Sequence, residues 1–299
     1  MGCGQAVPPA SRLTDVMHHS NNALKTVALL GLLSAILIIG GRAIAGDQGI
    51  EYGLGIAVVM NFASYFFSDK IALATSGAQP VTQETAPEIY ARVAPLVGGL
   101  AQRMGIPMPK LYITPEPSPN AFATGRDPNH ASVAFTQGIL TLMDDRELEG
   151  VVAHELGHVL NRDILISSIA GTIAAAITAL SRFAMWFGGR RDDRDRGSGL
   201  EALVMMILAP IAAMLIQMAI SRTREFSADA ASAKYIGSPY PLIGALRKLD
   251  TWSQRIPMEA TPTTQHLYIM KPLAGSSMMR LFSTHPSTEE RIQRLEQMR

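Results

Sequence analysis

The chain has 299 residues, of which 47% are hydrophobic and 17% are charged, and its mean hydropathy is +0.16. A formal net charge of +1 excludes the strongly basic surface that nucleic-acid binding needs, so we expect no nucleic-acid partner. The single cysteine, Cys3, excludes an intramolecular disulfide framework and a zinc site built from cysteines. The high hydropathy comes from long apolar runs rather than from an even spread of apolar residues.

The first two apolar runs follow a polar N-terminal tail, residues 1–22, and its Met1-Gly2-Cys3 start is expected to be disordered. Leu24 to Ile44 and Gly49 to Phe67 are each about as long as a helix must be to cross a bilayer. Because only a short turn separates them, they predict a transmembrane hairpin. A cleavable signal peptide does not fit, since a second run follows at once. Two buried core helices are the alternative.

The polar segment after this hairpin contains a helix and two strand candidates. Pro87 stands near the first turn of the helix and Gly105 stops it. The strand candidates are rich in β-branched and aromatic residues. We therefore expect a mainly helical domain with a small β-sheet. The predicted elements are a helix over Pro87 to Met104, a strand over Lys110 to Ile113, a loop over Pro115 to Gly125, a strand over Ala131 to Thr136 and a helical turn over Gln137 to Met143.

The run His154-Glu155-Leu156-Gly157-His158 fits the pattern H-E-x-x-H. Residues four apart lie on one face of a helix, so His154 and His158 can bind one metal ion. Glu155 lies at the flank of that ion, where it can take a proton from a water that the metal activates. Asp144 or Asp145 supplies an N-cap, and apolar residues recur at helical spacing. The pattern predicts the core of a zinc peptidase with one Zn²⁺ per chain.

A second pair of apolar runs, Ile164 to Phe187 and Leu200 to Ile220, follows this helix. The loop between them is bounded by glycines and contains four arginines and three aspartates. These runs are less purely apolar than the first pair, because they include Arg182 and Glu201. Their length favours two further spans, and a shallow hairpin that dips into the bilayer is the alternative.

Two histidines are too few, because catalytic zinc usually takes three protein ligands. A third histidine on the same helix is excluded, since Asn161 and Ile164 occupy the two further positions of that longer motif. A glutamate on a later helix is the other solution. Glu225 is the best candidate, because it follows the fourth apolar run and the hairpin would return it beside the motif. The weaker candidates are Glu201, Glu259, Glu289, Glu290 and Glu296.

Asp229 stands one helical turn beyond Glu225 and on the same face. Its natural role is to accept a hydrogen bond from a ligand histidine and so to fix the tautomer of that histidine. The alternative is that Glu225 and Asp229 pair with Arg222 and Arg224 on a helix surface.

Taken together, these pieces resemble the HtpX family of membrane zinc peptidases, relatives of the CAAX prenyl protease. The resemblance runs from Leu24 to Leu295 and departs from the family in the polar extension that ends at Asn22. It rests on the paired N-terminal spans and on four motifs. The motifs are Asn120-Ala121-Phe122-Ala123-Thr124-Gly125, His154-Glu155-Leu156-Gly157-His158, Arg224-Glu225-Phe226-Ser227-Ala228-Asp229 and Thr284-His285-Pro286.

The resemblance implies a mainly α membrane protein with four transmembrane or membrane-embedded helices and a zincin-like α+β catalytic domain. It also implies a multi-pass protein of the bacterial inner membrane that faces the cytoplasm and cleaves misfolded or damaged membrane proteins. The arginines of the second loop would then face outward, against the positive-inside rule. His285 is implied to lie near the active site, where it could stabilise the oxyanion. A cap on the helix Pro286 to Met298 is the alternative for His285.

An extended polypeptide substrate is expected to pair along the second strand, because main-chain hydrogen bonds make little demand on sequence. Asn120 is expected to orient the substrate or to steady its loop. The residues expected to bind substrate are Asn120, Ala131, Ser132, Val133, Ala134, Phe135 and Thr136.

The chain therefore divides into alternating polar and apolar parts, with one catalytic domain split by the second hairpin. An intramembrane zinc protease is disfavoured, because charged residues flank the motif on both sides. A non-enzymatic scaffold or transporter with a chance motif is disfavoured, because the spans are few and nearly free of central charges. The expected parts are a tail over residues 1–22, a hairpin over 23–67, catalytic halves over 68–163 and 221–299, and a second hairpin over 164–220.

Overall fold

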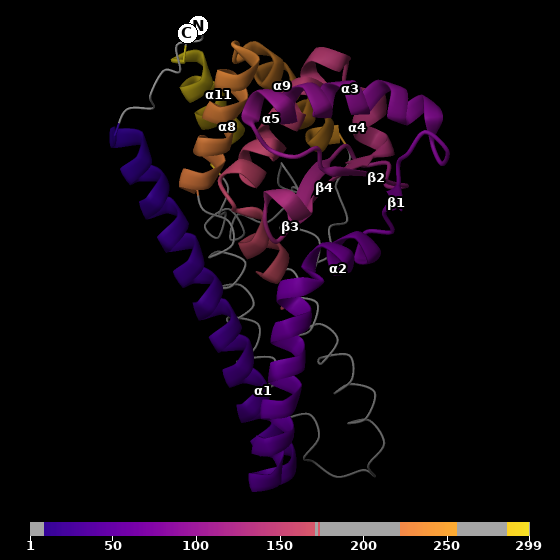
Figure 1. The fold of residues 1–299 in the computed structure, drawn as a ribbon. Coiled ribbons are helices and arrows are strands. Elements are labelled where there is room, and N and C mark those ends of the chain that lie inside the picture. The colour runs from indigo at the N-terminus through magenta and orange to yellow at the C-terminus, as the bar shows by residue number, and fades with distance from the viewer. Residues whose placement is uncertain (1–8, 171–172, 174–221, 256–285, 299) are drawn as a thin grey trace, which may run out of the picture.

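The computed structural model describes residues 9–170, 173, 222–255 and 286–298 (Figure 1). Leu200 to Ile220, most of Ile164 to Phe187 and His285 lie outside these residues, and so do the predictions made for them. The described part is mainly helical with one small mixed sheet, as the sequence predicts.

Helix α1 (Pro9–Phe66) turns back on itself at Gly46, whose φ of 64° favours glycine, and its two legs run side by side from that turn (Figure 1). Asn61 Nδ2 donates to Ser34 Oγ across the legs at 2.8 Å. α1 begins at Pro9, within the polar tail of residues 1–22.

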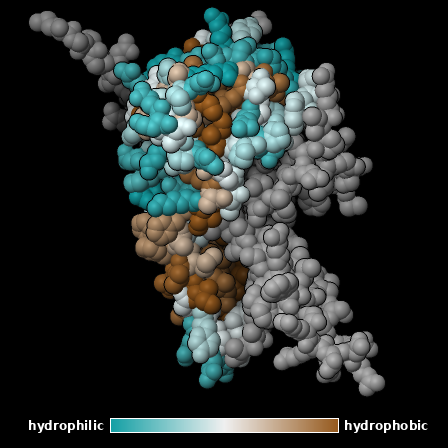
Figure 2. All heavy atoms as spheres, turned by 90° about the vertical axis from the view of Figure 1, so that its right-hand side faces the viewer, coloured by the Kyte–Doolittle hydropathy of each residue, from teal (hydrophilic) through white to brown (hydrophobic). Residues whose placement is uncertain are grey.

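The membrane candidates within the described residues lie in these two legs. Leu24–Arg42 is long and apolar enough to cross a bilayer. Gly46–Phe66 passes the same test only together with α2 (Ser68–Thr75), which bends away by 80°. The described residues thus contain one such helix, or up to two if the bent pair is one span. Figure 2 shows an apolar surface below the hydrophilic head of the molecule, and Tyr52, Val59 and Phe62 are among the exposed side chains of the second leg.

The sheet has the strand order β1-β2-β4-β3. Its strands are β1 (Gln79–Pro80), β2 (Lys110–Thr114), β3 (Ala121–Gly125) and β4 (Ala131–Thr136). β4 pairs with β2 in parallel and with β3 in antiparallel fashion, so within the described ranges β4 is central and β3 lies at the edge. The prediction of a loop up to Gly125 is therefore wrong over its last five residues, where pairing with β4 overrides the turn-rich composition before it.

Helices α3, α4, α8, α9 and α11 lie around α5 (Asp145–Leu160), which carries the H-E-x-x-H motif. Asp144 caps α5 in a capping box with Glu147, and the predicted apolar stripe is fully buried. The stripe is Leu148, Val151, Val152, Leu156 and Val159. The neighbouring helices are α3 (Pro87–Met104), α4 (Gln137–Leu142), α8 (Arg222–Ile236), α9 (Tyr240–Arg255) and α11 (Thr288–Glu296).

Two long side chains fix the start of α5. Arg92 on α3 donates to the carbonyl oxygens of Leu140 in α4 and of Met143, which follows α4, at 2.5 and 2.7 Å. Lys248 on α9 donates to Glu147 in the first turn at 2.5 Å. The orientation of the motif helix is therefore set from two sides before any metal ligand is considered.

Small residues let α8 and α9 approach α5 closely. A Cβ atom on Gly150 would lie 2.6 Å from the backbone nitrogen of Leu242, so only glycine fits there. Ser232 on α8 donates to the carbonyl oxygen of Gly150 at 2.9 Å. A Cβ atom on Gly157 would lie 3.1 Å from the Cα of Ala228. This close contact brings the ligand candidate on α8 over the motif.

Candidate metal centre

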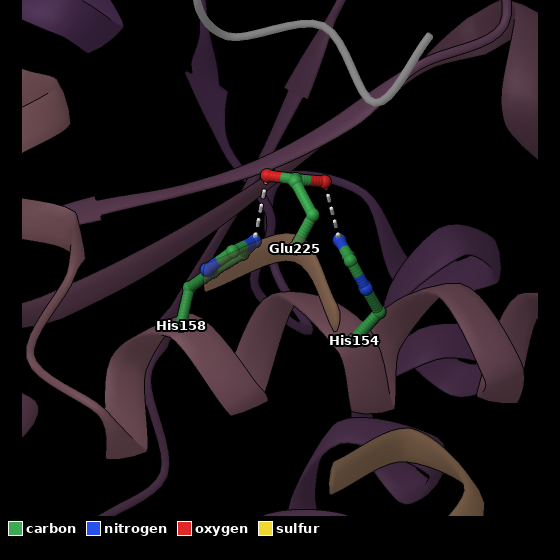
Figure 3. A group of neighbouring side chains, drawn as sticks. All are labelled: His154, His158 and Glu225. Atoms are coloured by element: carbon green, nitrogen blue, oxygen red, sulfur yellow. Dashed lines mark ion pairs between the residues drawn. The ribbon is translucent and has the colours of Figure 1, made fainter. Parts of the chain in front are cut away.

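His154, His158 and Glu225 converge in the part of the chain that the structure describes (Figure 3). The two imidazoles extend from one face of α5 toward the Glu225 carboxylate, which comes from α8. One ligand atom from each of the three side chains lies within 4.8 Å of the others. His154 and Glu225 are buried, and His158 is half-buried.

The spacing of these atoms fits a metal ion better than direct contact. Glu225 lies 3.7 Å from His154 Nε2 and 3.6 Å from His158 Nε2, beyond ordinary hydrogen-bond length. Ligands about 2.1 Å from a tetrahedral zinc ion are about 3.4 Å apart. Nitrogen and carboxylate donors at this separation therefore suit a single zinc ion.

The His154 side chain is held from behind by Asp229, as the sequence predicts. Asp229 Oδ1 lies 2.9 Å from His154 Nδ1, and both side chains are buried. Burial alone would raise the pKa of Asp229, but the Arg291 guanidinium and the hydrogen bond with His154 hold it below its usual value. An ionised carboxylate on Nδ1 leaves Nε2 free to face Glu225.

Arg291 completes this arrangement and was missed by the sequence reasoning. It extends from α11 and donates to both oxygens of Asp229, from Nε at 2.9 Å and from a terminal nitrogen at 2.6 Å. Although α11 is rich in charged residues, Arg291 and Leu295 are 2% and 0% exposed. Their spacing of four residues, which marks one buried face, was the available signal.

His158 has a partner of its own in Asp163. Its Nδ1 lies 3.4 Å from Asp163 Oδ2. Burial alone would lower the pKa of His158, but the bond to Asp163 and the carboxylates of Glu225 and Glu155 raise it to about 9. In the protein without metal, His158 therefore carries a proton at neutral pH, and metal binding must release it.

Glu155 lies next to these residues and faces the sheet. It is 5% exposed, and its Oε2 accepts a hydrogen bond from the Ala123 N–H of β3 at 2.9 Å. Burial raises the pKa of Glu155, although the charges of His154 and His158 oppose the rise. A carboxylate with a raised pKa is suited to accept a proton and return it near neutral pH.

Asn120 and His285 are the remaining residues that the sequence predicts near the site, apart from the substrate strand. The backbone of Asn120 is fixed to Thr136 at the end of the sheet, since its N–H donates to Thr136 Oγ1 at 2.8 Å and its carbonyl accepts from the Thr136 N–H at 2.9 Å. His285 lies outside the described residues. The alternative that His285 caps the last helix is wrong, because Ser287 is the N-cap of α11 and accepts from the Glu290 N–H.

Substrate pairing along Ala131 to Thr136 is also wrong, although the strand itself is confirmed. β4 pairs with β2 on one side and with β3 on the other over its whole length. Its residues Ala131, Ser132, Val133, Ala134, Phe135 and Thr136 are all buried. A central strand has no open edge to offer a peptide.

Replacing Arg291 with Met should lower stability by about 3 kcal/mol, because Asp229 would then be a buried charge without its guanidinium partner. Thermal or denaturant unfolding of the purified protein measures this loss. Arg247→Met on α9 is the matched control, since its pair with Glu296 is exposed and should contribute about 1 kcal/mol or less. Equal losses in the two variants would contradict a special role for Arg291.

Comparison with known proteins agrees with this geometry. Residues 87–299 match the family described as Peptidase family M48. The protein named Protease HtpX homolog from Desulforapulum autotrophicum is 50% identical over 279 residues, which cover 92% of this chain and 89% of that protein. The Protease HtpX homolog of Thermodesulfovibrio yellowstonii is 52% identical over 281 residues, covering 93% and 98%.

Among solved structures, the crystal structure of S. mikatae Ste24p is similar, with a TM-score of 0.49 and 19% sequence identity, and the match covers 94% of this chain and 66% of that chain. The family match covers more than half of the chain, and identities of about 50% extend over most of it. The chain therefore belongs to peptidase family M48, and it is a metalloprotease with HtpX proteases among its relatives.

Proposed function

We propose that the chain is a membrane-bound zinc endopeptidase in which His154, His158 and Glu225 hold one Zn²⁺ ion. The observation that carries this proposal is the convergence of two imidazoles and one carboxylate beside a buried second carboxylate. Three protein ligands leave a fourth position open, as catalytic zinc sites require. The protease names of the relatives support the same reading.

Glu155 is the general base of the proposed reaction. A zinc ion bound at this site would lower the pKa of a water molecule and polarise the scissile carbonyl. Glu155 takes the proton from the attacking water and passes it to the leaving nitrogen of the cleaved peptide bond. The Ala123 N–H keeps the Glu155 carboxylate turned toward the sheet. His285 is proposed to stabilise the oxyanion that develops on the scissile carbonyl.

Substrate is proposed to pair along β3 rather than β4. β3 pairs only with β4 among the described residues, which leaves its outer edge without a strand partner there, although its five residues are buried. The bond from the Thr136 N–H to the Asn120 carbonyl shows that the backbone groups of Ala121, Ala123 and Gly125 point away from β4. Of these groups, the Ala123 N–H is already bonded to Glu155. Since Ala123 also contacts Glu155, a paired peptide would run directly past the general base. Asn120 is proposed to fix the start of this edge.

The proposed substrates are misfolded or damaged membrane proteins, and the proposed location is the bacterial inner membrane with the catalytic domain in the cytoplasm. The candidate span Leu24–Arg42 and the apolar surface of α1 support attachment to a membrane. Two further spans over residues 164–220 would bring both catalytic halves to one side. The arginine-rich loop would then face outward together with its three aspartates.

Glu155→Gln should reduce kcat about a hundred- to ten-thousand-fold and leave zinc bound, because only the proton acceptor is lost. Glu225→Ala should instead lower the zinc content below one ion per chain. Degradation of an unfolded membrane protein and elemental analysis of the same preparations measure the two effects. Glu88→Gln, an exposed change on α3, is the control and should alter neither. Full activity of the Glu155→Gln protein with zinc bound would falsify the general-base role.

Backbone N-methylation of a cleaved peptide should raise KM at alternate residues, because only every second amide of an added strand faces β3. Each lost hydrogen bond should raise KM by about two- to tenfold. Steady-state kinetics with a series of singly methylated peptides gives the pattern. An equal effect at every residue, or none at any, would contradict pairing along the edge of β3.

A topology reporter fused at Gly197 should be exposed outside the cytoplasm if the second pair of apolar runs crosses the bilayer. A second reporter after Arg299 should be cytoplasmic in the same cells and serves as the control. Cytoplasmic signals from both fusions would contradict four spans and favour a hairpin that only dips into the membrane.

A further inference from the structure

We propose that Asp163 is a positioning residue that orients the metal ligand His158, a role that rests on the zinc peptidase function proposed above. The Asp163 carboxylate lies against the far nitrogen of His158, opposite the nitrogen that faces Glu225. Each ligand histidine then has its own carboxylate partner, since Asp229 lies in the same relation to His154.

The backbone after α5 is folded so that Asp163 comes back beneath His158. The Asp163 N–H donates to the His158 carbonyl at 2.9 Å, and the Arg162 N–H donates to the Val159 carbonyl at 3.1 Å. These two bonds close a left-handed helix end of the kind that usually needs glycine. Here Arg162 adopts it with a φ of 56°, which costs about 1 kcal/mol or more. The turn thus holds Asp163 at this place despite backbone strain.

The side chain of Asp163 points inward rather than to solvent. Asp163 is 3% exposed, while the preceding Arg162 is exposed. Its Oδ2 lies 3.4 Å from His158 Nδ1. A proton held on Nδ1 by this carboxylate leaves the lone pair of Nε2 directed at the position 3.6 Å from Glu225 where an ion would bind.

Two cations from other elements surround the same carboxylate. Arg224, buried on α8 beside the ligand Glu225, interacts electrostatically with Asp163. Lys25, at the start of the candidate span in α1, interacts with both Asp163 and Arg224. Their positive charge offsets part of the cost of burying the Asp163 carboxylate. Asp163 therefore interacts with side chains from three helices, namely Lys25 of α1, Arg224 of α8 and His158 of α5.

A simpler role must be separated from this one. Asp163 also precedes the helix that starts at Ile164, and its carbonyl accepts from the Ser167 N–H at 3.4 Å. Aspartate is a favoured N-cap, but asparagine and serine cap helices about as well. Asp163→Asn and Asp163→Ser therefore keep a capping role while they remove the charge opposite His158.

The test compares zinc affinity of the full-length parent, Asp163→Asn and Asp163→Ser by competition with a chelator in detergent. Loss of a carboxylate behind a ligand histidine should weaken zinc binding about ten- to a hundredfold. At saturating zinc, kcat should fall while KM stays unchanged. Asp47→Asn, an exposed change at the turn of α1, is the matched control and should bind zinc as the parent does.

The outcomes separate the two proposals. Zinc affinities within about twofold of the parent for both Asp163 variants would overturn the positioning role and leave the peptidase proposal intact. A parent protein that binds no zinc would overturn both. Thermal unfolding of each variant within a few degrees of the parent shows that a weakened zinc site is not a consequence of lost folding.

Discussion

The close contact of α5 with α8 is the constraint on which the rest of the site depends. Gly157 stands between the two zinc-ligand histidines proposed here, and any larger side chain would push on Ala228 of α8. Glu225 lies one turn before Ala228, so a shift of α8 would move its carboxylate away from both imidazoles. Gly157 thus lets α8 lie close enough to α5 for Glu225 to reach the two histidines, although Gly157 itself is not a proposed ligand.

Buried charge is the second feature that shapes the centre. His154, His158 and Glu225 are enclosed by two aspartates and two arginines, and none of Asp163, Asp229, Arg224 and Arg291 is more than 4% exposed. Such pairs contribute little to stability in comparison with apolar packing, because each ion must give up its hydration. They do restrict the orientation of the side chains they contact. The arrangement therefore favours a fixed ligand geometry over a stable core.

The features that were predicted correctly from the sequence are those that depend on short-range spacing. The motif, its N-cap Asp144 and the helix Pro87–Met104 all follow from short-range patterns, and Glu225 followed from the need for a third ligand after a hairpin. Arg291 and β3 were missed, because their roles depend on partners 62 residues away in one case and on the pairing with β4 in the other. No local pattern distinguishes a central strand from an edge strand, so the sequence placed substrate pairing on a strand that is paired on both sides.

The position of β3 links the site to helix α1, which carries the candidate membrane span. Arg126, directly after β3, lies with its guanidinium 5.6 Å from the ring centre of Phe66 at the end of α1. α2 turns away there by 80° and packs its Leu73 against Phe122 of β3. The edge strand thus lies where the second leg of α1 meets the soluble domain.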